Sequence, residues 1–163
     1  MCDAPALRVL TRADVAAALD LYTELTLGPP CIAPEAFYSV LDHPGTSISG
    51  AFTRDGLVAM ATLHLLPNVT WNARPYGLVE NVVTRADHRK RGFGRAVLEQ
   101  LLATAWAANA YKVMLMTGQK RGALGFYQSV GFTQEDKHGL VIRCPLSSGT
   151  HTQRVVQNGK NII

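Results

Sequence analysis

The sequence predicts a single α/β domain in which helices flank a mixed, mostly antiparallel sheet. Three observations support this fold class. The chain has 163 residues, of which 47% are hydrophobic, enough for one core but short for two. Helical and strand-like apolar patterns alternate along it. Near the centre, a strand, a glycine-containing loop, a helix and a second strand follow one another, which indicates a parallel pair joined by a right-handed crossover.

The N-terminal half contains two helices and four strands. Val15, Leu19 and Leu25 recur at helical spacing, and prolines in 27–34 end this helix before Pro34 begins another. Asp55-Gly56 is typical of a tight hairpin turn between two strands. In order, we predict a strand at 7–10, helices at 11–25 and 34–43, and strands at 46–53, 57–66 and 78–84.

The C-terminal half continues with a long helix that opens within "DHRKRGFGRAV" and buries one apolar face. We then predict a strand at 111–117, a short helix at 121–130, and final strands at 131–132 and 139–145. One domain over 1–146 is expected, followed by a polar tail, 147–163, that forms a small hairpin or a dimer arm or is flexible.

The cysteines and the N-terminus favour a soluble, cytoplasmic protein. Three cysteines without CxxC spacing suggest neither a disulfide framework nor a zinc ribbon. No apolar leader opens the chain, and no run approaches the roughly 18 apolar residues that cross a bilayer.

Positive charge is concentrated in one window. The chain carries a net charge of +4, and residues 85–95 hold five Lys and Arg side chains with a single acid, Asp87. The net positive charge of this window, +4, therefore equals the net charge of the whole chain. A local cluster of this kind favours a compact anionic ligand over diffuse binding of nucleic acid or membrane, so neither is expected as a partner.

The same window places Gly92 and Gly94 at the start of the predicted helix. A helix N-terminus offers free backbone NH groups and partial positive charge, and glycine lets a phosphate approach them closely. A solvated turn is the alternative from the residues alone. Three other glycine motifs do not fit. The sequence lacks the Gly-Lys-Ser/Thr of a Walker A loop, has Val97 where the dinucleotide fingerprint needs a third glycine, and lacks the later aromatic residues of an RNA-recognition motif.

The pattern Arg89-x-x-Gly92-x-Gly94 matches the Q/R-x-x-G-x-G/A signature of the GNAT acetyltransferase superfamily, and the order of elements over 77–143 also resembles that family. The resemblance implies the GNAT fold, with one splayed parallel strand pair, and acetyl-CoA as acetyl donor, without a metal. Lys120 departs from the family, which often has asparagine there. The resemblance assigns cofactor contacts to Val82, Val83, Thr84, Arg89, Lys90, Arg91, Gly92, Phe93, Gly94, Arg95, Lys120, Ala123 and Tyr127.

Two side chains carry the catalytic roles that the resemblance implies. Glu80 interrupts an apolar strand, where burial should raise the pKa of a carboxyl group and suit it as a general base. A structural acid bonded to backbone or to Arg74 is the alternative. Tyr127 lies where family members often place the acid that protonates the departing thiolate; the alternative is simple helix packing. His88 is expected on the loop surface.

The acceptor is expected to be the primary amine of a small molecule, attacked directly without an acyl-enzyme. Trp71, Arg74 and Tyr76, with Glu80 and the segment "GPPCIAPEAF", are the predicted acceptor wall. The chain also resembles glucosamine-6-phosphate N-acetyltransferases, but Met116 stands where these carry an acid. Peptide acetylation and a non-catalytic module that binds coenzyme A or nucleic acid remain alternatives. A homodimer is expected because symmetric pairs are common.

Overall fold

The computed structural model describes residues 4–25, 31, 33–134 and 138–143. Residues 1–133 belong to one compact unit and 134–163 to another. The first unit holds the sheet, whose strands are β1 (Ala6–Val9), β2 (Thr46–Thr53), β3 (Gly56–Leu66), β4 (Tyr76–Thr84) and β5 (Val113–Leu115). Its helices are α1 (Val15–Tyr22), α2 (Pro34–Leu41), α3 (Thr70–Ala73), α4 (Phe93–Ala107) and α5 (Leu124–Val130).

The five strands lie in sequence order across the sheet. The first three pairings are antiparallel and β4 with β5 is parallel, as α4 crosses between them. The mixed, mostly antiparallel sheet predicted from the sequence is therefore confirmed. Residues 131–132 and 138–143 form no strand, so the predicted strand over 131–132 is wrong, and so is the one over 139–145 for its described part; apolar residues alone cannot supply the ladder partner that a strand needs.

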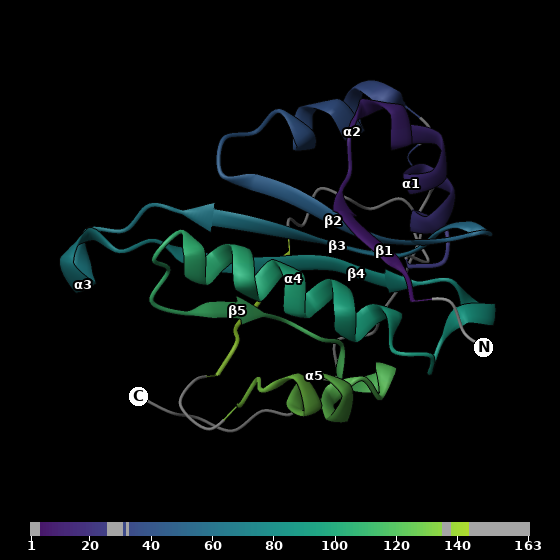
Figure 1. Ribbon diagram of the computed structural model, residues 1–163. Coiled ribbons are helices and arrows are strands. Elements are labelled where there is room, and N and C mark those ends of the chain that lie inside the picture. Colours follow the sequence, from purple (N-terminus) through teal and green to yellow (C-terminus); the bar gives the residue numbers. More distant parts are fainter. Residues whose placement is uncertain (1–3, 26–30, 32, 135–137, 144–163) are drawn as a thin grey trace. The chain divides into compact units, whose positions relative to one another are not determined.

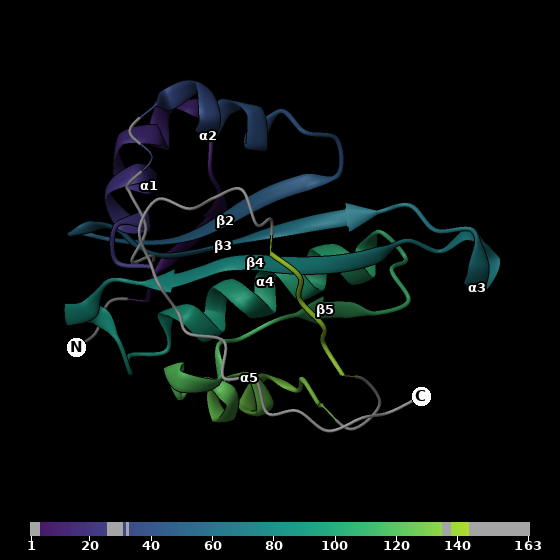
Figure 2. The same ribbon diagram turned by 180° about the vertical axis from the view of Figure 1, so that it is seen from behind.

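Helices cover both faces of the sheet (Figure 1). On one face, α1 and α2 enclose a core with Leu21, Phe37, Ile48 and Met60. On the other, α4 packs against the sheet, as the view from behind also shows (Figure 2). The second core contains Val58, Leu63, Val79, Val97, Leu98 and Leu101.

Each helix of the first half begins at a recognisable signal. Pro34 occupies the first position of α2, where its missing NH costs nothing. Before α1, the carboxylate of Asp14 accepts hydrogen bonds from the Thr11 backbone NH (2.8 Å) and from the Arg8 guanidinium (2.6 and 2.7 Å). These contacts fix the turn that joins β1 to α1, which packs over β3 and β4.

Candidate functional site

The sheet opens between β4 and β5. Their parallel pairing is confined to Gly77 with Val113, Leu78 with Met114 and Val79 with Leu115. β4 then continues to Thr84, whereas β5 ends at Leu115. The two strands, which the resemblance stated above implies should splay, therefore part after Val79, and the following residues of β4 form one wall of an opening in the sheet.

A β-bulge lies just beyond this point. Thr62 pairs with Glu80 and Met60 pairs with Val83, so two residues of β4, Asn81 and Val82, face one residue of β3. Asn81 has a φ of 54°, in the left-handed region that asparagine tolerates better than most residues. The bulge turns the end of β4, and with it the chain that leads into α4.

The loop after β4 delivers free NH groups at the start of α4. The first intrahelical bond runs from the Ala96 NH to the Gly92 carbonyl (3.0 Å), so the NH groups of Phe93, Gly94 and Arg95 have no intrahelical acceptor. No side chain caps this helix start and no acid lies in its first turn. The fifteen-residue helix directs its positive end at this position, a geometry that favours an anion.

The two glycines of the loop are needed for different reasons. Gly92 has a φ of 88°, and a Cβ built on it would meet nothing within 4 Å, so the backbone conformation alone favours glycine. At Gly94 a Cβ would lie 3.0 Å from Thr84 Oγ1 and 3.4 Å from Phe126 Cζ. Gly94 therefore allows the first turn of α4 to pack closely against β4 and α5.

The four cations of the loop divide into two pairs. Arg89 donates to the Thr84 carbonyl (3.1 Å) and contacts Glu24 (3.1 Å), and Arg95 donates to the Ser129 carbonyl (2.9 Å) and hydroxyl (2.8 Å). These two arginines brace the loop and α4. Lys90 and Arg91 are exposed and make no hydrogen bond or ion pair with the described part of the chain, so their charges are available to a ligand.

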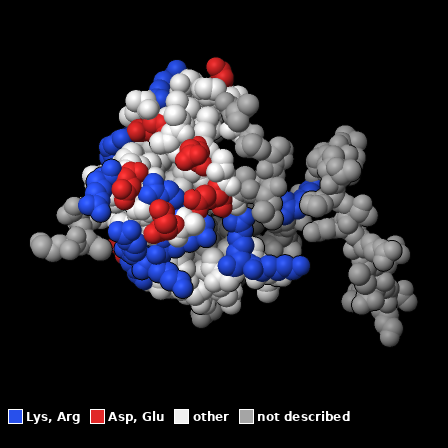
Figure 3. Space-filling model, turned by 90° about the vertical axis from the view of Figure 1, so that its right-hand side faces the viewer, with Lys and Arg blue, Asp and Glu red and all other residues white. Residues whose placement is uncertain are grey.

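Basic side chains gather at this end of the molecule, next to a group of acids (Figure 3). His88 lies beneath the loop, not on its surface as predicted, and is only 3% exposed. Its Nδ1 lies 2.6 Å from Asp87 and its Nε2 lies 3.2 Å from Asp55. His88 is buried because Asp55, in the hairpin between β2 and β3, gives its imidazole a polar partner that is distant in the sequence.

Glu80 lies at the opening, on the sheet face that α1 and α2 cover, because it pairs across the strands with Thr62. It is half-buried, less than the sequence led us to expect, since β5 has ended beside it. Its carboxylate makes no ion pair with a described residue. Arg74, the structural partner considered above, instead donates to the carbonyls of Asn109 and Ala110 (both 3.1 Å).

Tyr127 approaches the opening from the other face. It lies in α5, contacts the rings of Phe126 and Phe132, and packs against the α4 core. Burial raises the pKa of its hydroxyl, the charge of Arg121 lowers it, and the charge of Glu80 raises it. Glu80 and Tyr127 therefore share one electrostatic environment from opposite faces of the sheet.

The other predicted contacts lie around these two residues. Val83 is buried on the α1 side and Val82 packs on the α4 side, so both also serve the core. The Thr84 side chain packs closely against Gly94. Lys120 is exposed in a short 3-10 turn, Gln119–Arg121, and Ala123 caps the start of α5.

Three residues of the predicted acceptor wall, Trp71, Arg74 and Tyr76, lie at or near the end of β4 that is next to α3 (Figure 1). Of the segment "GPPCIAPEAF", residues 28–30 and 32 lie outside the described residues, and Pro34 to Phe37 begin α2. Trp71 stacks on Tyr111, with ring centroids 5.3 Å apart, and the Lys112 ammonium lies 5.6 Å from the centre of the Tyr76 ring. Trp71 to Ala73 have positive φ values, so α3 is a left-handed turn that the sequence did not indicate. Glu80 lies four residues after Tyr76 along the strand, a distance of about 13 Å.

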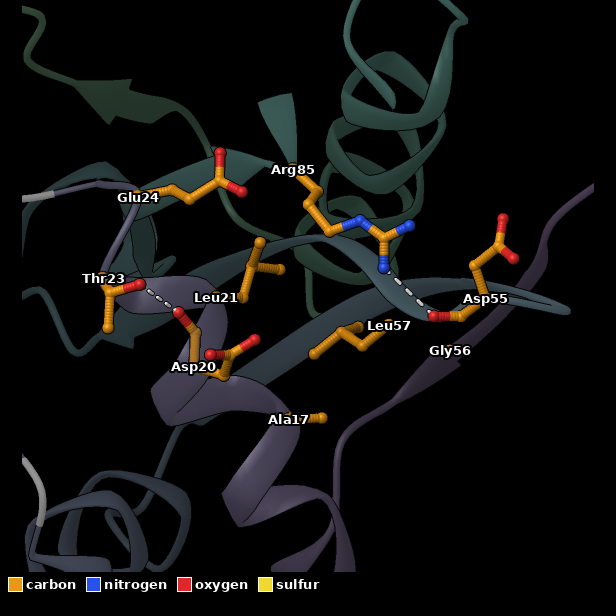
Figure 4. A pocket seen from close by; sticks show the side chains of 9 residues that line it. All are labelled: Ala17, Asp20, Leu21, Thr23, Glu24, Asp55, Gly56, Leu57 and Arg85. Atoms are coloured by element: carbon orange, nitrogen blue, oxygen red, sulfur yellow. Dashed lines mark hydrogen bonds between the residues drawn. The ribbon is translucent and has the colours of Figure 1, made fainter. Parts of the chain in front are cut away.

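A hollow of about 250 Å³ lies elsewhere, between the end of α1, the β2–β3 hairpin and the start of the loop (Figure 4). Asp20, Glu24 and Asp55 line it, opposite Arg85, which donates to the Asp55 carbonyl (3.1 Å). Glu24 also accepts a hydrogen bond from the Ala86 NH (2.7 Å), which holds the loop toward α1. An acidic lining does not suit a phosphate ligand.

Two features bear on other classes of site. No group of three His, Cys, Asp or Glu side chains in the described ranges is placed to hold a metal ion. None of the described helices combines the length and the apolar character that crossing a bilayer demands. Sequence reasoning also missed the buried hydroxyl of Thr62, which pairs with Glu80 across the strands; the signal was a lone threonine inside the apolar run "VAMATLHL".

Comparison with known proteins identifies the arrangement. The sequence model of the acetyltransferase (GNAT) family matches residues 9–132. A glucosamine 6-phosphate N-acetyltransferase of Trypanosoma brucei brucei is 29% identical over 135 residues, 80% of this chain and 90% of that protein.

Solved structures agree. An acetyltransferase from Agrobacterium tumefaciens is 40% identical, with a TM-score of 0.80 over 85% of this chain and 99% of the other. An acetyltransferase from Trypanosoma brucei is 26% identical, with a TM-score of 0.73 over the same shares. The chain belongs to the GNAT family and is an acetyltransferase enzyme.

Proposed function

We propose that the protein transfers the acetyl group of acetyl-CoA directly to the primary amine of a small molecule. One observation carries the proposal. The opening after Val79 is flanked by the free NH groups of α4, by a carboxylate on one sheet face and by a phenol on the other. GNAT acetyltransferases use acetyl-CoA, and this chain offers a seat for its diphosphate and two groups for proton transfer.

The diphosphate would bind the NH groups of residues 90–95, with Lys90 and Arg91 adding charge. Arg89 and Arg95 keep the loop in the shape that presents these NH groups. β4 has no strand on its β5 side beyond Val79, and we assign contact with the pantetheine arm to Val82, Val83 and Thr84 along this edge. Acetyl-CoA supplies the activated thioester; every other group named here belongs to the chain.

Glu80 would accept the proton of the acceptor ammonium. The neutral amine then forms a bond to the thioester carbonyl carbon, the carbon–sulfur bond breaks, and the nitrogen loses its second proton, which replaces the proton that Tyr127 gives to the thiolate. Tyr127 would donate its proton to the departing thiolate, a role that its raised pKa favours because the hydroxyl remains protonated at neutral pH. The two groups lie on opposite sheet faces, so the base and the acid do not compete for one position.

Glucosamine 6-phosphate is the first acceptor to test, because the curated relative from Trypanosoma brucei brucei carries that activity in its name. Met116 follows β5 and is 57% exposed. It favours a different amine, because a methionine cannot bind the substrate as the acid at this position in glucosamine-6-phosphate N-acetyltransferases would. We also assign Trp71, Arg74 and Tyr76 to recognition of the distal part of a longer acceptor, because of their distance from Glu80.

The test is a screen for release of the coenzyme thiol. Acetyl-CoA is combined in turn with glucosamine 6-phosphate, glucosamine, an aminoglycoside, simple alkyl amines and a peptide with a free N-terminus. We expect turnover with at least one small amine, and thermal stabilisation by acetyl-CoA alone as mass action requires. Stabilisation without thiol release from any amine would instead favour a non-catalytic coenzyme-binding protein.

A homodimer in a reducing, cytoplasmic compartment completes the proposal. Cys31 is an exposed free thiol, which suits reducing conditions. The C-terminal residues 147–163, predicted as a hairpin or dimer arm, lie outside the described residues, as do Cys2 and Cys144. Sedimentation analysis at several concentrations measures the oligomeric state: a single species of about 18 kDa would contradict the dimer.

A further inference from the structure

One face of β4 carries a strip of side chains that leads away from Glu80. Val79 packs in the core under α4, so its neighbours Leu78 and Glu80 point to the opposite face of the sheet. Tyr76 shares that face, because the bulge in β4 begins only after Glu80. Leu78 is half-buried and belongs to neither of the two cores. The strip therefore runs from a carboxylate, past an apolar side chain, to an aromatic ring.

The neighbouring strand β5 adds two side chains to this strip. Val113 packs in the core under α4, so Met114 points to the opposite face, where it pairs with Leu78. Met114 is half-buried and, like Leu78, is part of neither core. The ammonium of Lys112 lies 5.6 Å from the centre of the Tyr76 ring. The completed strip has a carboxylate at one end, two apolar side chains in the middle and an ammonium at the other end.

The Lys112 ammonium is held in place by two aromatic rings. It lies 5.3 Å from the centre of the Tyr111 ring as well as 5.6 Å from that of Tyr76, distances at which a ring face attracts a cation. Segments 66–78 and 102–118, which surround it, contain no Asp or Glu. Lys112 also forms no ion pair with any residue that the structure describes. Its charge is therefore positioned by the fold but not neutralised within the described residues.

The two other basic side chains near the strip are engaged elsewhere. Arg74 donates to two backbone carbonyls of the loop before β5 (both 3.1 Å). His64 lies beside Leu78 on β3, but its Nδ1 is hydrogen-bonded to Thr46 (2.8 Å). Lys112 is therefore the side chain of this strip that is best placed to meet an anion.

We propose that Lys112 binds an anionic group of the acceptor, and that the enzyme selects amines whose nitrogen is joined to such a group through an apolar stretch. The inference rests on the proposed function, in which Glu80 receives the acceptor ammonium. Tyr76 lies about 13 Å from Glu80 along the strand, so the nitrogen and the anion of a bound acceptor are on the order of 10 Å apart. Leu78 and Met114 lie between them and would contact the apolar stretch. Opposite charges at the two ends of the strip fix the direction of the acceptor.

The test compares ω-amino carboxylates of four to ten carbons with alkyl amines of the same length in the thiol-release assay. Lys112→Met removes the charge but keeps an apolar side chain, and Lys112→Arg keeps the charge. Arg54→Met is the matched control for net charge. Arg54 is exposed in the β2–β3 hairpin, at the end of β3 opposite to the Tyr76 ring, and makes no hydrogen bond or ion pair with the described part of the chain.

We expect the wild-type enzyme to prefer the amino carboxylate to the matched alkyl amine, with the largest preference at one length within the series. Lys112→Met should lower this ratio of kcat/KM values by about 10- to 100-fold, the usual contribution of a hydrogen bond to a charged group, and mainly through KM. Lys112→Arg should retain most of the preference, and the KM for acetyl-CoA should not change. The inference is overturned if the wild type prefers no amino carboxylate, or if Arg54→Met lowers the ratio as much as Lys112→Met.

Binding without turnover separates this inference from the proposed function. The amino carboxylates are titrated by calorimetry into protein that is saturated with coenzyme A. Binding that weakens about 10-fold or more in Lys112→Met, together with no thiol release from any amine, would mean that the proposed function fails and the anion site stands. No binding to the wild type, or equal binding to both proteins, contradicts the inference whatever the screen shows. A Lys112→Met variant that is less stable in urea yet keeps the wild-type ratio would mean that other residues of the chain cover the strip, which also overturns it.

Discussion

Gly94→Ala tests the close packing that sets the opening. The new Cβ would lie 3.0 Å from Thr84 Oγ1 and 3.4 Å from Phe126 Cζ, so the first turn of α4 or its neighbours must move by a few tenths of an ångström. Overpacking of this kind costs about 1–3 kcal/mol. We expect the free energy of unfolding, measured by urea denaturation, to decrease by about 1–3 kcal/mol. The affinity for coenzyme A should decrease as well.

Two further variants separate this packing effect from a general intolerance of the loop. Thr84→Ala removes the atom in closest contact, so Gly94→Ala should cost roughly 1 kcal/mol less in that background, a coupling typical of residues in contact. Gly92→Ala should cost about 1 kcal/mol through its positive φ and show no coupling to Thr84. Equal costs of Gly94→Ala in both backgrounds would refute the packing argument.

Three other predictions concern catalysis and stability. Glu80→Gln should lower kcat by about 10²-fold or more, the usual contribution of a positioned base, with unchanged affinity for acetyl-CoA by calorimetry; wild-type kcat would remove Glu80 from the base role. Tyr127→Phe should slow turnover more than it weakens acetyl-CoA binding, and since burial and Glu80 raise the pKa of Tyr127, the wild-type enzyme should keep its acid at pH 9; equal kcat in both proteins at pH 9 would make the residue structural. Asp14→Asn should lower the free energy of unfolding at pH 7 by up to roughly 1 kcal/mol, because it removes the carboxylate charge that pairs with the Arg8 guanidinium. The Arg8 guanidinium lowers the pKa of Asp14, so this stabilisation is present above the unfolded pKa of about 4 and is lost as the pH falls through the lower folded value; a difference between the two proteins that persists undiminished at pH 2 would contradict this.

Local sequence signals were sufficient for most of the fold. The prolines in 27–34, the Asp55-Gly56 turn and the apolar face of α4 each depend on neighbouring residues, and the elements that they define are present. The crossover rule then gave the parallel pair of β4 and β5. The final strand was different, because a strand exists only through a partner that no local pattern names.

The candidate site was predictable where backbone geometry alone creates it. Gly92 marked the start of α4 and its free NH groups correctly. The roles of Arg89 and Arg95 depend on Glu24 and Ser129, which are distant in sequence, so charge counting could not separate them from Lys90 and Arg91.

Side-chain direction was the harder problem. The bulge at Asn81 changes the face on which every later residue of β4 lies, and no residue pattern revealed it. Thr62 could not be placed opposite Glu80 for another reason: the connection between β3 and β4 sets their register, and the sequence did not indicate its left-handed turn at Trp71 to Ala73. His88 was misplaced for a related reason, since its burial depends on Asp55 of a different hairpin.

The central claim is that the free NH groups at the start of α4 bind a diphosphate and so direct a thioester toward Glu80. A crystal structure with bound coenzyme A measures this directly. We expect diphosphate oxygens within hydrogen-bond distance of backbone NH groups among residues 90–95, and the pantetheine arm beside β4 beyond Val79. Coenzyme A bound instead in the hollow lined by Asp20 and Arg85, or at the Trp71 end of β4, would contradict the account.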